Sequence, residues 1–230
     1  KDNGKYMSNN YPTGTVTFLF TDIEGSTKLA REHPETWEGA RAWHHAILRE
    51  AIESNHGYVF QIIGDSFCTA FHTAGDALRA AIQVQRVLKT SEFLKNSEVS
   101  LRVRMGIHTG EAESHNGEYR GYLTLSMIQR VMSAGHGRQI LLSGASENLL
   151  HGQLPTDVSL RDMGEHKLKD VPQPARIFQV VAPDLQSEFP ALRALDVFPN
   201  NLPAQLTSFV GREKEILEVT QMLKQSRLLT

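Results

Sequence analysis

The stretch Gly14-Thr-Val-Thr-Phe-Leu-Phe-Thr21, followed by Asp22-Ile-Glu-Gly-Ser-Thr27, decides the fold. The first half is short, apolar and rich in β-branched and aromatic residues, which predicts a buried central strand. The polar second half ends that strand, and apolar residues then recur with helical spacing from Pro34 to Ser54. This strand–turn–helix start puts Asp22 at a strand end, with backbone carbonyls nearby.

A β-hairpin is predicted next, because Gly64-Asp65 separates the strand-like runs Tyr58–Ile63 and Ser66–Phe71. The later elements expected are helices at Thr73–Leu88, Leu123–Ser133 and Gly144–Leu150, and strands at Leu101–Thr109, Gln139–Leu142, Val158–Met163 and Arg176–Val181. Hairpins exclude an all-parallel sheet. The order predicts an α+β, ferredoxin-like (split βαβ) sandwich, an antiparallel or mixed sheet with helices packed on one face.

Composition excludes several classes of protein. The chain has 230 residues, of which 40% are hydrophobic and 22% charged, as in an ordinary globular protein rather than a disordered chain, a collagen or a coiled coil. Its net charge of −2 lacks the basic excess that phosphate-coating proteins carry, so we expect no nucleic acid to bind this stretch.

The single cysteine, Cys68, excludes an internal disulfide framework and a multi-cysteine zinc site. No apolar run approaches the roughly 18 residues that span a membrane, and Lys1 to Asn10 has no apolar signal core. We therefore expect a cytoplasmic location with no membrane partner.

Changes in composition along the chain predict its domain boundaries. We expect a disordered tail over 1–12 and one domain over 13–182. Residues 183–205 contain four prolines and predict an extended linker. Residues 206–230 contain a helix starting near Arg212, which cannot bury its apolar face alone and so indicates the start of a second domain.

Two aspartates follow apolar strands and are candidates for chemistry. Asp22 and Asp65 could converge to form an oxygen site for Mg²⁺ or Mn²⁺. The backbone amides of Gly25-Ser26-Thr27 could cradle a phosphate. The alternative is that Asp22 caps a helix and Asp65 simply occupies a turn.

Three other features predict structural roles. Arg102 and Arg104 lie on the polar side of their strand, where solvation or an interchain salt bridge is expected. The pair His44-His45 lies on a helix, whose neighbouring side chains point apart, so no metal site is expected there. Cys68 falls in a predicted buried strand and is expected to be an inert core thiol.

Five blocks of sequence, in order, resemble a class III nucleotide cyclase catalytic domain over residues 13–182. They are Phe20-Thr-Asp-Ile-Glu-Gly-Ser-Thr27, Gly64-Asp-Ser-Phe67, Arg104-Met-Gly-Ile-His-Thr-Gly110, Met132-Ser-Ala-Gly-His-Gly137 and Gly164-Glu-His-Lys-Leu-Lys-Asp170. The bacterial type fused to a STAND or LuxR-like ATPase is the most similar. Phe209-Val-Gly-Arg-Glu-Lys-Glu215 resembles the opening of such an ATPase.

The resemblance implies conversion of ATP, possibly GTP, to the 3′,5′-cyclic nucleotide and pyrophosphate, with two Mg²⁺ or Mn²⁺ ions per active site. Asp22 and Asp65 match the metal-binding aspartates, with the Ile23 carbonyl as an auxiliary ligand. Arg130 matches the arginine that stabilises charge on the α-phosphate, and Lys169 the lysine that holds the terminal phosphates. Each site would combine two chains, which implies a homodimer with composite active sites.

Three positions depart from the family pattern. Gln61 replaces the base-selecting lysine, Leu123 falls near the second base-selecting position, and Ser126 replaces the ribose-orienting asparagine. Lost polar partners relax base discrimination and weaken positioning. Two hypotheses follow: a weak or relaxed cyclase, or a catalytically degenerate nucleotide-binding and dimerisation module that regulates a downstream ATPase.

Overall fold

Strand β1 (Gly14–Ile23) lies inside the sheet, as its apolar sequence predicts. The computed structural model describes residues 11–91 and 99–194, so the expected ATPase start lies outside the described residues. Every residue of β1 from Val16 to Thr21 is buried. It pairs antiparallel with a neighbour on each side, which leaves its two faces to be covered by helices.

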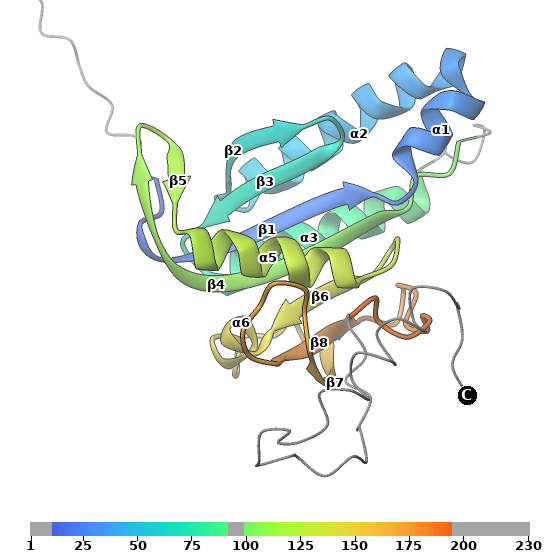
Figure 1. Cartoon of the computed structure of the whole chain (residues 1–230). Helices are drawn as coiled ribbons and strands as arrows, with labels where there is room; N and C mark the ends of the chain where they lie inside the picture. Colours follow the sequence, from blue (N-terminus) through green and yellow to red (C-terminus); the bar gives the residue numbers. More distant parts are fainter. Residues whose placement is uncertain (1–10, 92–98, 195–230) are drawn as a thin grey trace, which may run out of the picture. The chain divides into compact units, whose positions relative to one another are not determined.

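The sheet has eight strands in the order β2-β3-β1-β4-β6-β8-β7, with β5 paired to β4 (Figure 1). The other strands are β2 (Tyr58–Ile63), β3 (Ser66–Phe71), β4 (Val103–His115), β5 (Glu118–Arg120), β6 (Ile140–Ser143), β7 (Ser159–His166) and β8 (Ala175–Val181). Only the β4–β6 pair is parallel in the described sheet. The order β2-β3-β1-β4 is that of a split βαβ unit, so the predicted α+β fold class is confirmed.

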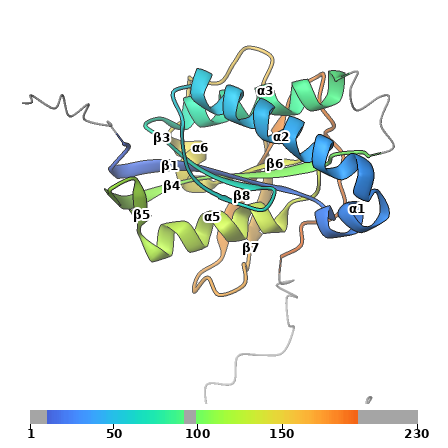
Figure 2. The same cartoon turned by 90° about the horizontal axis from the view of Figure 1, so that it is seen from above.

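Helices α2 (Pro34–Ser54) and α3 (Ala74–Thr90) cover one face of the sheet (Figure 2). Their apolar residues pack with the odd-numbered residues of β1, such as Leu19 and Ile23, in the largest core cluster. Proline at the first turn of α2 suits a helix start, because its missing N–H has no partner there in any helix. The short helix α1 (Ser26–Glu32) precedes α2 and buries no residue.

Helix α5 (Tyr122–Ala134) lies on the opposite face (Figure 2), so the expectation of helices on a single face is wrong. Its residues Ile128 and Met132 pack with the even-numbered residues of β1, among them Phe18. The cause is the sheet's two-sided apolar character, since β1 buries both faces and each needs a cover. Helix α6 (Gly144–Asn148) contacts β4, β6 and β8.

A missing side chain sets the distance between α5 and the sheet. A Cβ at Gly106 of β4 would lie 2.6 Å from the backbone nitrogen of Met132 and 2.8 Å from its Cα. Real Cβ atoms do not approach backbone that closely, so only glycine lets α5 rest directly on β4 at this point.

The structure extends the prediction in three places. The strand expected to end at Thr109 continues to His115, because it stays paired with β1 as far as Ala112 and then with β5. At the start, Tyr11 packs on Tyr58 with ring centroids 4.3 Å apart. Residues 183–194, part of the expected linker, have neither helix nor strand but contact the domain through ion pairs such as Arg86–Asp184. No helix in the described ranges is long and apolar enough to cross a bilayer.

Candidate active site

Asp22 lies at the end of β1, where its carboxylate is already engaged. The Arg104 guanidinium donates to Asp22 Oδ2 from Nε at 2.9 Å and from Nη2 at 2.6 Å. The Ser66 hydroxyl donates to Oδ1 at 2.7 Å. The pairing follows from register, since Asp22 and Arg104 are directly opposite in the β1–β4 ladder. Side-chain exposure is 18% for Asp22 and 22% for Arg104, so bulk water screens this pair only partly.

Asp65 lies in the β2–β3 turn and reaches the same place. Its Oδ2 accepts a hydrogen bond from the Ile23 backbone N–H at 2.9 Å. Gly64, just before it, has a φ of 63°, the left-handed conformation that a tight hairpin turn requires. The structure therefore brings Asp22, Ile23 and Asp65 together, through Ser66 on one side and the Ile23 amide on the other.

The donor chemistry of this group suits a hard divalent cation. Mg²⁺ is commonly held by one or two carboxylates and by substrate phosphates rather than by an all-protein cage. Two carboxylates and a neighbouring backbone carbonyl match that pattern. Across residues 11–91 and 99–194, no cluster of three or more His, Cys, Asp or Glu side chains could hold a metal ion. Any cation at this group would therefore need oxygen ligands from elsewhere, such as a triphosphate.

Glu24 organises the loop that follows Ile23. Arg102 Nη2 lies 2.9 Å from Glu24 Oε2, and Arg193 pairs with Oε1. Burial opposes ionisation of Glu24, but the hydrogen bond and charge of Arg193, the charge of Arg102 and the Gly137 N–H together hold its pKa below the usual value. The Glu24 carboxylate therefore joins three parts of the chain, those that contain Arg102, Gly137 and Arg193.

Two histidines of α2 support the hairpin that carries Asp65. His45 Nε2 is 3.1 Å from the Gly64 carbonyl, which can only accept, so His45 donates. His44 is fully buried, and neither ring nitrogen has a hydrogen-bond partner among the described residues. Burial lowers its pKa to about 3, with a further contribution from His45. Both rings meet Phe67 edge-on, so the pair has a packing role.

A second group of predicted residues gathers where α5 meets the turn after β7. Arg130 Nη2 lies 2.5 Å from Asp170 Oδ2, and Asp170 directly follows Lys169. Arg130 Nε is buried without a partner in the described part of the chain. Lys169 is exposed, whereas Leu168 before it is 2% exposed and anchors the turn in the core. Arg130 thus binds the residue next to the exposed Lys169.

The remaining predicted residues lie at the rims of these groups. Leu123 and Ser126 are on α5, seven and four residues before Arg130, on the same side of the helix. Leu123 is 75% exposed and Ser126 is half-buried. Gln61 is exposed on β2, just after a bulge. Of the expected phosphate loop, Gly25 has a φ of 74° and Ser26 and Thr27 begin α1. No hydrogen bond or ion pair joins the Arg130 group to the Asp22 group within the described residues.

Sequence reasoning missed two members of the Asp22 group. Arg104 was expected in solvent or in an interchain salt bridge, but it pairs within its own chain. Ser66 belongs to the Gly64-Asp-Ser-Phe67 block, but the sequence predicted no role for its hydroxyl. The sequence shows that Arg104 is a cationic residue on the polar side of a strand. It does not show the strand register that puts Arg104 opposite Asp22.

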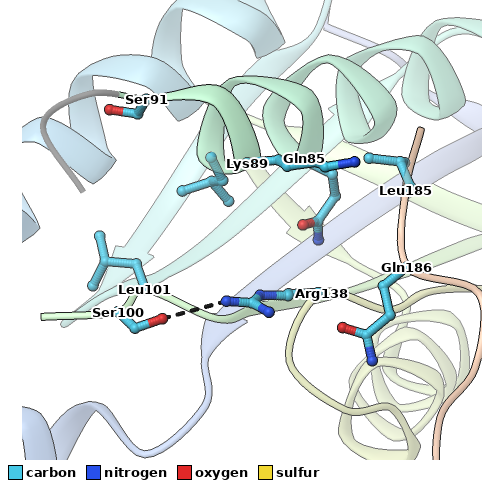
Figure 3. A pocket seen from close by; sticks show the side chains of 9 residues that line it. Gln85, Lys89, Ser91, Ser100, Leu101, Arg138, Leu185 and Gln186 are labelled. Carbon is cyan, nitrogen blue, oxygen red and sulfur yellow. Dashed lines mark hydrogen bonds between the residues drawn. The ribbon is translucent and has the colours of Figure 1, made fainter. Parts of the chain in front are cut away.

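The described chain also has a cavity of about 440 Å³ between α3, the residues before β4 and the segment after β8 (Figure 3). Arg138 crosses it, with Nη2 3.4 Å from the Ser100 hydroxyl. None of its lining residues is a predicted site residue. The chemistry expected of this chain therefore does not lie in this cavity.

Comparison with known proteins agrees with the geometry. Residues 8–181 match the family model described as the adenylate and guanylate cyclase catalytic domain. Among curated proteins, an uncharacterized protein of Mycobacterium tuberculosis is 40% identical over 209 residues, covering 89% of this chain and 70% of the relative. A receptor-type adenylate cyclase of Trypanosoma brucei brucei is 30% identical, covering 74% of this chain and 17% of its own length.

Solved structures show the same fold. An adenylate cyclase from Trypanosoma brucei, solved in its monomeric state, superposes with a TM-score of 0.68 at 27% identity, covering 81% of this chain and 97% of that one. The adenylyl cyclase CyaB from P. aeruginosa superposes with a TM-score of 0.63 at 22% identity, covering 80% and 97%. The family model spans most of the chain, and so the chain belongs to the adenylate and guanylate cyclase catalytic domain family, the class III nucleotide cyclases.

Proposed function

We propose that the chain converts ATP, or GTP, to the 3′,5′-cyclic monophosphate and pyrophosphate, at composite sites between two copies. The observation that carries this proposal is the convergence of Asp22 and Asp65 on one backbone amide at the end of β1. The family match supports the class of reaction, and this convergence supports its location at the end of β1.

In the proposed reaction, the ribose 3′ hydroxyl gives its proton to solvent water and its oxygen attacks the α-phosphorus. The bond between that phosphorus and the pyrophosphate oxygen breaks, and pyrophosphate leaves. Asp22, Asp65 and the Ile23 carbonyl would hold two Mg²⁺ or Mn²⁺ ions. Bound there, the ions would lower the pKa of the attacking hydroxyl and neutralise the triphosphate. The chain's own part is to orient these oxygens, which the Ser66 hydroxyl does for Asp22 and the Ile23 N–H does for Asp65.

The second group of residues would neutralise the negative charge of the phosphates. Arg130 would stabilise the α-phosphate in the transition state, and Lys169 would hold the terminal phosphates. In the free chain, Asp170 occupies the Arg130 guanidinium. A bound triphosphate would replace the Asp170 carboxylate as the partner of Arg130, so the guanidinium would stay paired. Because no hydrogen bond or ion pair joins this group to Asp22 among the described residues, we propose that it faces the metal group of a second copy.

Base choice would be loose at this site. Gln61 can donate to or accept from either purine, whereas Leu123 offers no hydrogen bond. Ser126 has a shorter side chain than the family's asparagine and gives the ribose a weaker hold. We therefore expect slow turnover and small discrimination between ATP and GTP.

A second candidate is a degenerate module that binds nucleotide and dimerises, and so regulates an ATPase-like part beginning near 206. The observations that favour it are the 75% exposed leucine at the base-selecting position and the guanidinium already bound to Asp22. In this case Arg104 would act as a permanent substitute for the cation.

The test is incubation of the chain with Mn²⁺ and ATP, or GTP, followed by chromatographic detection of the cyclic product. Asp65→Asn keeps an oxygen that can accept from Ile23 but removes the charge. It should lower activity by about 100-fold or more. The control is Asp162→Asn, in an exposed ion pair with Arg176, which should leave activity unchanged. Nucleotide binding without either cyclic product would support the second candidate.

A further inference from the structure

A short segment after the last strand is anchored beneath α5. We call residues 191–194 the clasp. They have neither helix nor strand, yet Leu192 is 7% exposed and belongs to a core cluster with residues of α5, β6 and β8. The Arg193 backbone N–H donates to the Ala134 carbonyl at the end of α5, at 2.9 Å. The clasp is therefore held by both packing and hydrogen bonding.

One clasp side chain extends to the loop after β1. The Arg193 guanidinium forms an ion pair with Glu24, whose own side chain is 15% exposed. Arg102 holds the other oxygen of Glu24, and the Glu24 backbone N–H donates to the Arg102 carbonyl at 2.9 Å. Glu24 directly follows Ile23 and is two residues from Asp22, so a restraint on Glu24 also restrains the backbone that presents these two residues.

The loop has little packing of its own. Gly25 is exposed, and a Cβ built there would meet no atom within 4 Å. The helix that follows, α1, buries no residue and has no side-chain cap. Segments with few buried contacts open locally at low free-energy cost. Beside the backbone hydrogen bond of Glu24 and the partly buried Leu29 and Ala30 of α1, the ion pairs of Glu24 are the side-chain contacts that restrain this loop.

We propose that Arg193 is a positioning residue. Acting through Glu24, it holds the loop in the shape that points the Asp22 carboxylate and the Ile23 carbonyl at a divalent cation. The nature of that ligand rests on the proposed function; the coupling of the clasp to the loop does not.

The clasp also touches the second group of site residues. Leu192 clusters with Val131 and Leu168, the immediate neighbours of Arg130 and Lys169. A displacement of the clasp would therefore disturb the metal loop and the phosphate-binding surface together.

The experiment compares Arg193→Ala with Arg193→Lys in the full 230-residue chain. Hydrogen exchange measures the loop directly, and electron paramagnetic resonance of free Mn²⁺ measures the affinity for the metal alone. Arg193→Ala should speed amide exchange over residues 23–29 about fivefold and weaken Mn²⁺ binding by a similar factor. Arg193→Lys keeps the charge and should restore most of both.

The matched control is Arg161→Ala. It removes the ion pair of 2.9 Å between Arg161 and Glu188, which also joins the domain to the segment after β8 but does not involve Glu24. It should change neither readout. Glu24→Gln combined with Arg193→Ala should be no worse than Glu24→Gln alone, because Arg193 acts through that carboxylate.

Equal exchange and equal Mn²⁺ affinity in Arg193→Ala and Arg161→Ala would overturn the inference. Additive effects of the Glu24 and Arg193 substitutions would overturn it too, since they would mean separate routes. An unmodified chain that makes no cyclic product would refute the proposed function alone, because the exchange readout needs no turnover.

Discussion

Arg104→Met should strengthen divalent-metal binding while weakening the metal-free fold. In the structure, both guanidinium contacts of Arg104 go to Asp22 Oδ2, at 2.6 and 2.9 Å. A cation that binds Asp22 must displace or neutralise that partner. Methionine has a similar length and no charge, and it fits a strand position that is only partly exposed.

The size of the effect follows from burial. Unit charges about 4 Å apart interact by about 4 kcal/mol at an effective dielectric constant of about 20. Desolvation offsets most of this, and charged hydrogen bonds contribute about 1.5–3 kcal/mol net. Because about one fifth of each side chain stays exposed to water, we take the low end, about 1.5 kcal/mol, which corresponds to roughly a tenfold change in affinity. Arg104→Met should thus bind Mn²⁺ about tenfold more tightly and lose a similar free energy of unfolding without metal.

Calorimetric titration with Mn²⁺ gives the affinity, and urea denaturation in a chelator gives the stability. Arg176→Met is the control, because Arg176 forms an exposed ion pair with Asp162 and has no contact with Asp22 or Glu24 in the described residues. An Arg104→Met chain that binds Mn²⁺ more weakly than the unmodified chain would refute the reasoning. In that case Arg104 would orient the Asp22 carboxylate for the metal instead of competing with it.

Three further results are expected. Folding lowers the pKa of His44 to about 3, so below its unfolded pKa of about 6.5 the unfolded chain binds a proton that the folded chain does not. The free energy of unfolding therefore falls as the pH is lowered from 6.5 toward 3, by about 2 kcal/mol between pH 7 and pH 5. Urea denaturation should show this loss, and His44→Leu should remove it, unlike His151→Ala, which changes an exposed side chain. Burial raises the pKa of the Cys68 thiol to about 11, so iodoacetamide at pH 8 should label the unfolded chain but not the folded one; rapid native labelling would show that the strand opens. Inactive Asp65→Asn and Arg130→Ala chains, when mixed, should recover about one quarter of normal cyclase activity, because half of the dimers would then hold one intact composite site; no recovery would place each site within one chain.

Local sequence patterns predicted most of the elements. Helix α2 begins and ends where the apolar spacing and Pro34 indicate, and the β2–β3 hairpin turns at Gly64-Asp65. These features depend on neighbouring residues, and neighbours are visible in a sequence. The seven-residue helix α1 and the three-residue strand β5 were not predicted, because such short elements have too few residues to show a period.

The site was harder to predict, because its contacts join distant parts of the chain. Asp22 and Arg104 are 82 residues apart and meet only through the β1–β4 register. Glu24 and Arg193 are 169 residues apart. The proline-rich composition near residue 190 predicts an extended linker, yet the buried Leu192, together with ion pairs from the same segment, anchors residues 183–194 to the domain. Backbone direction can be inferred from local patterns, whereas side-chain partners depend on tertiary register.

The bare backbone at Gly106 has a consequence for how this molecule can vary. The backbone of α5 lies directly against the backbone of β4 there, with no side chain of Gly106 between them. The distance between helix and sheet is therefore fixed by backbone contact and not by side chains that could repack. A single methyl group at that point would lift the helix and, since a helix moves as a rod, shift Arg130 less than one turn away. The position of Arg130, which we propose to contact a phosphate, is thus set by the absence of a side chain at Gly106. A substitution at residue 106 could therefore alter the proposed site without changing any of the residues proposed to bind the nucleotide.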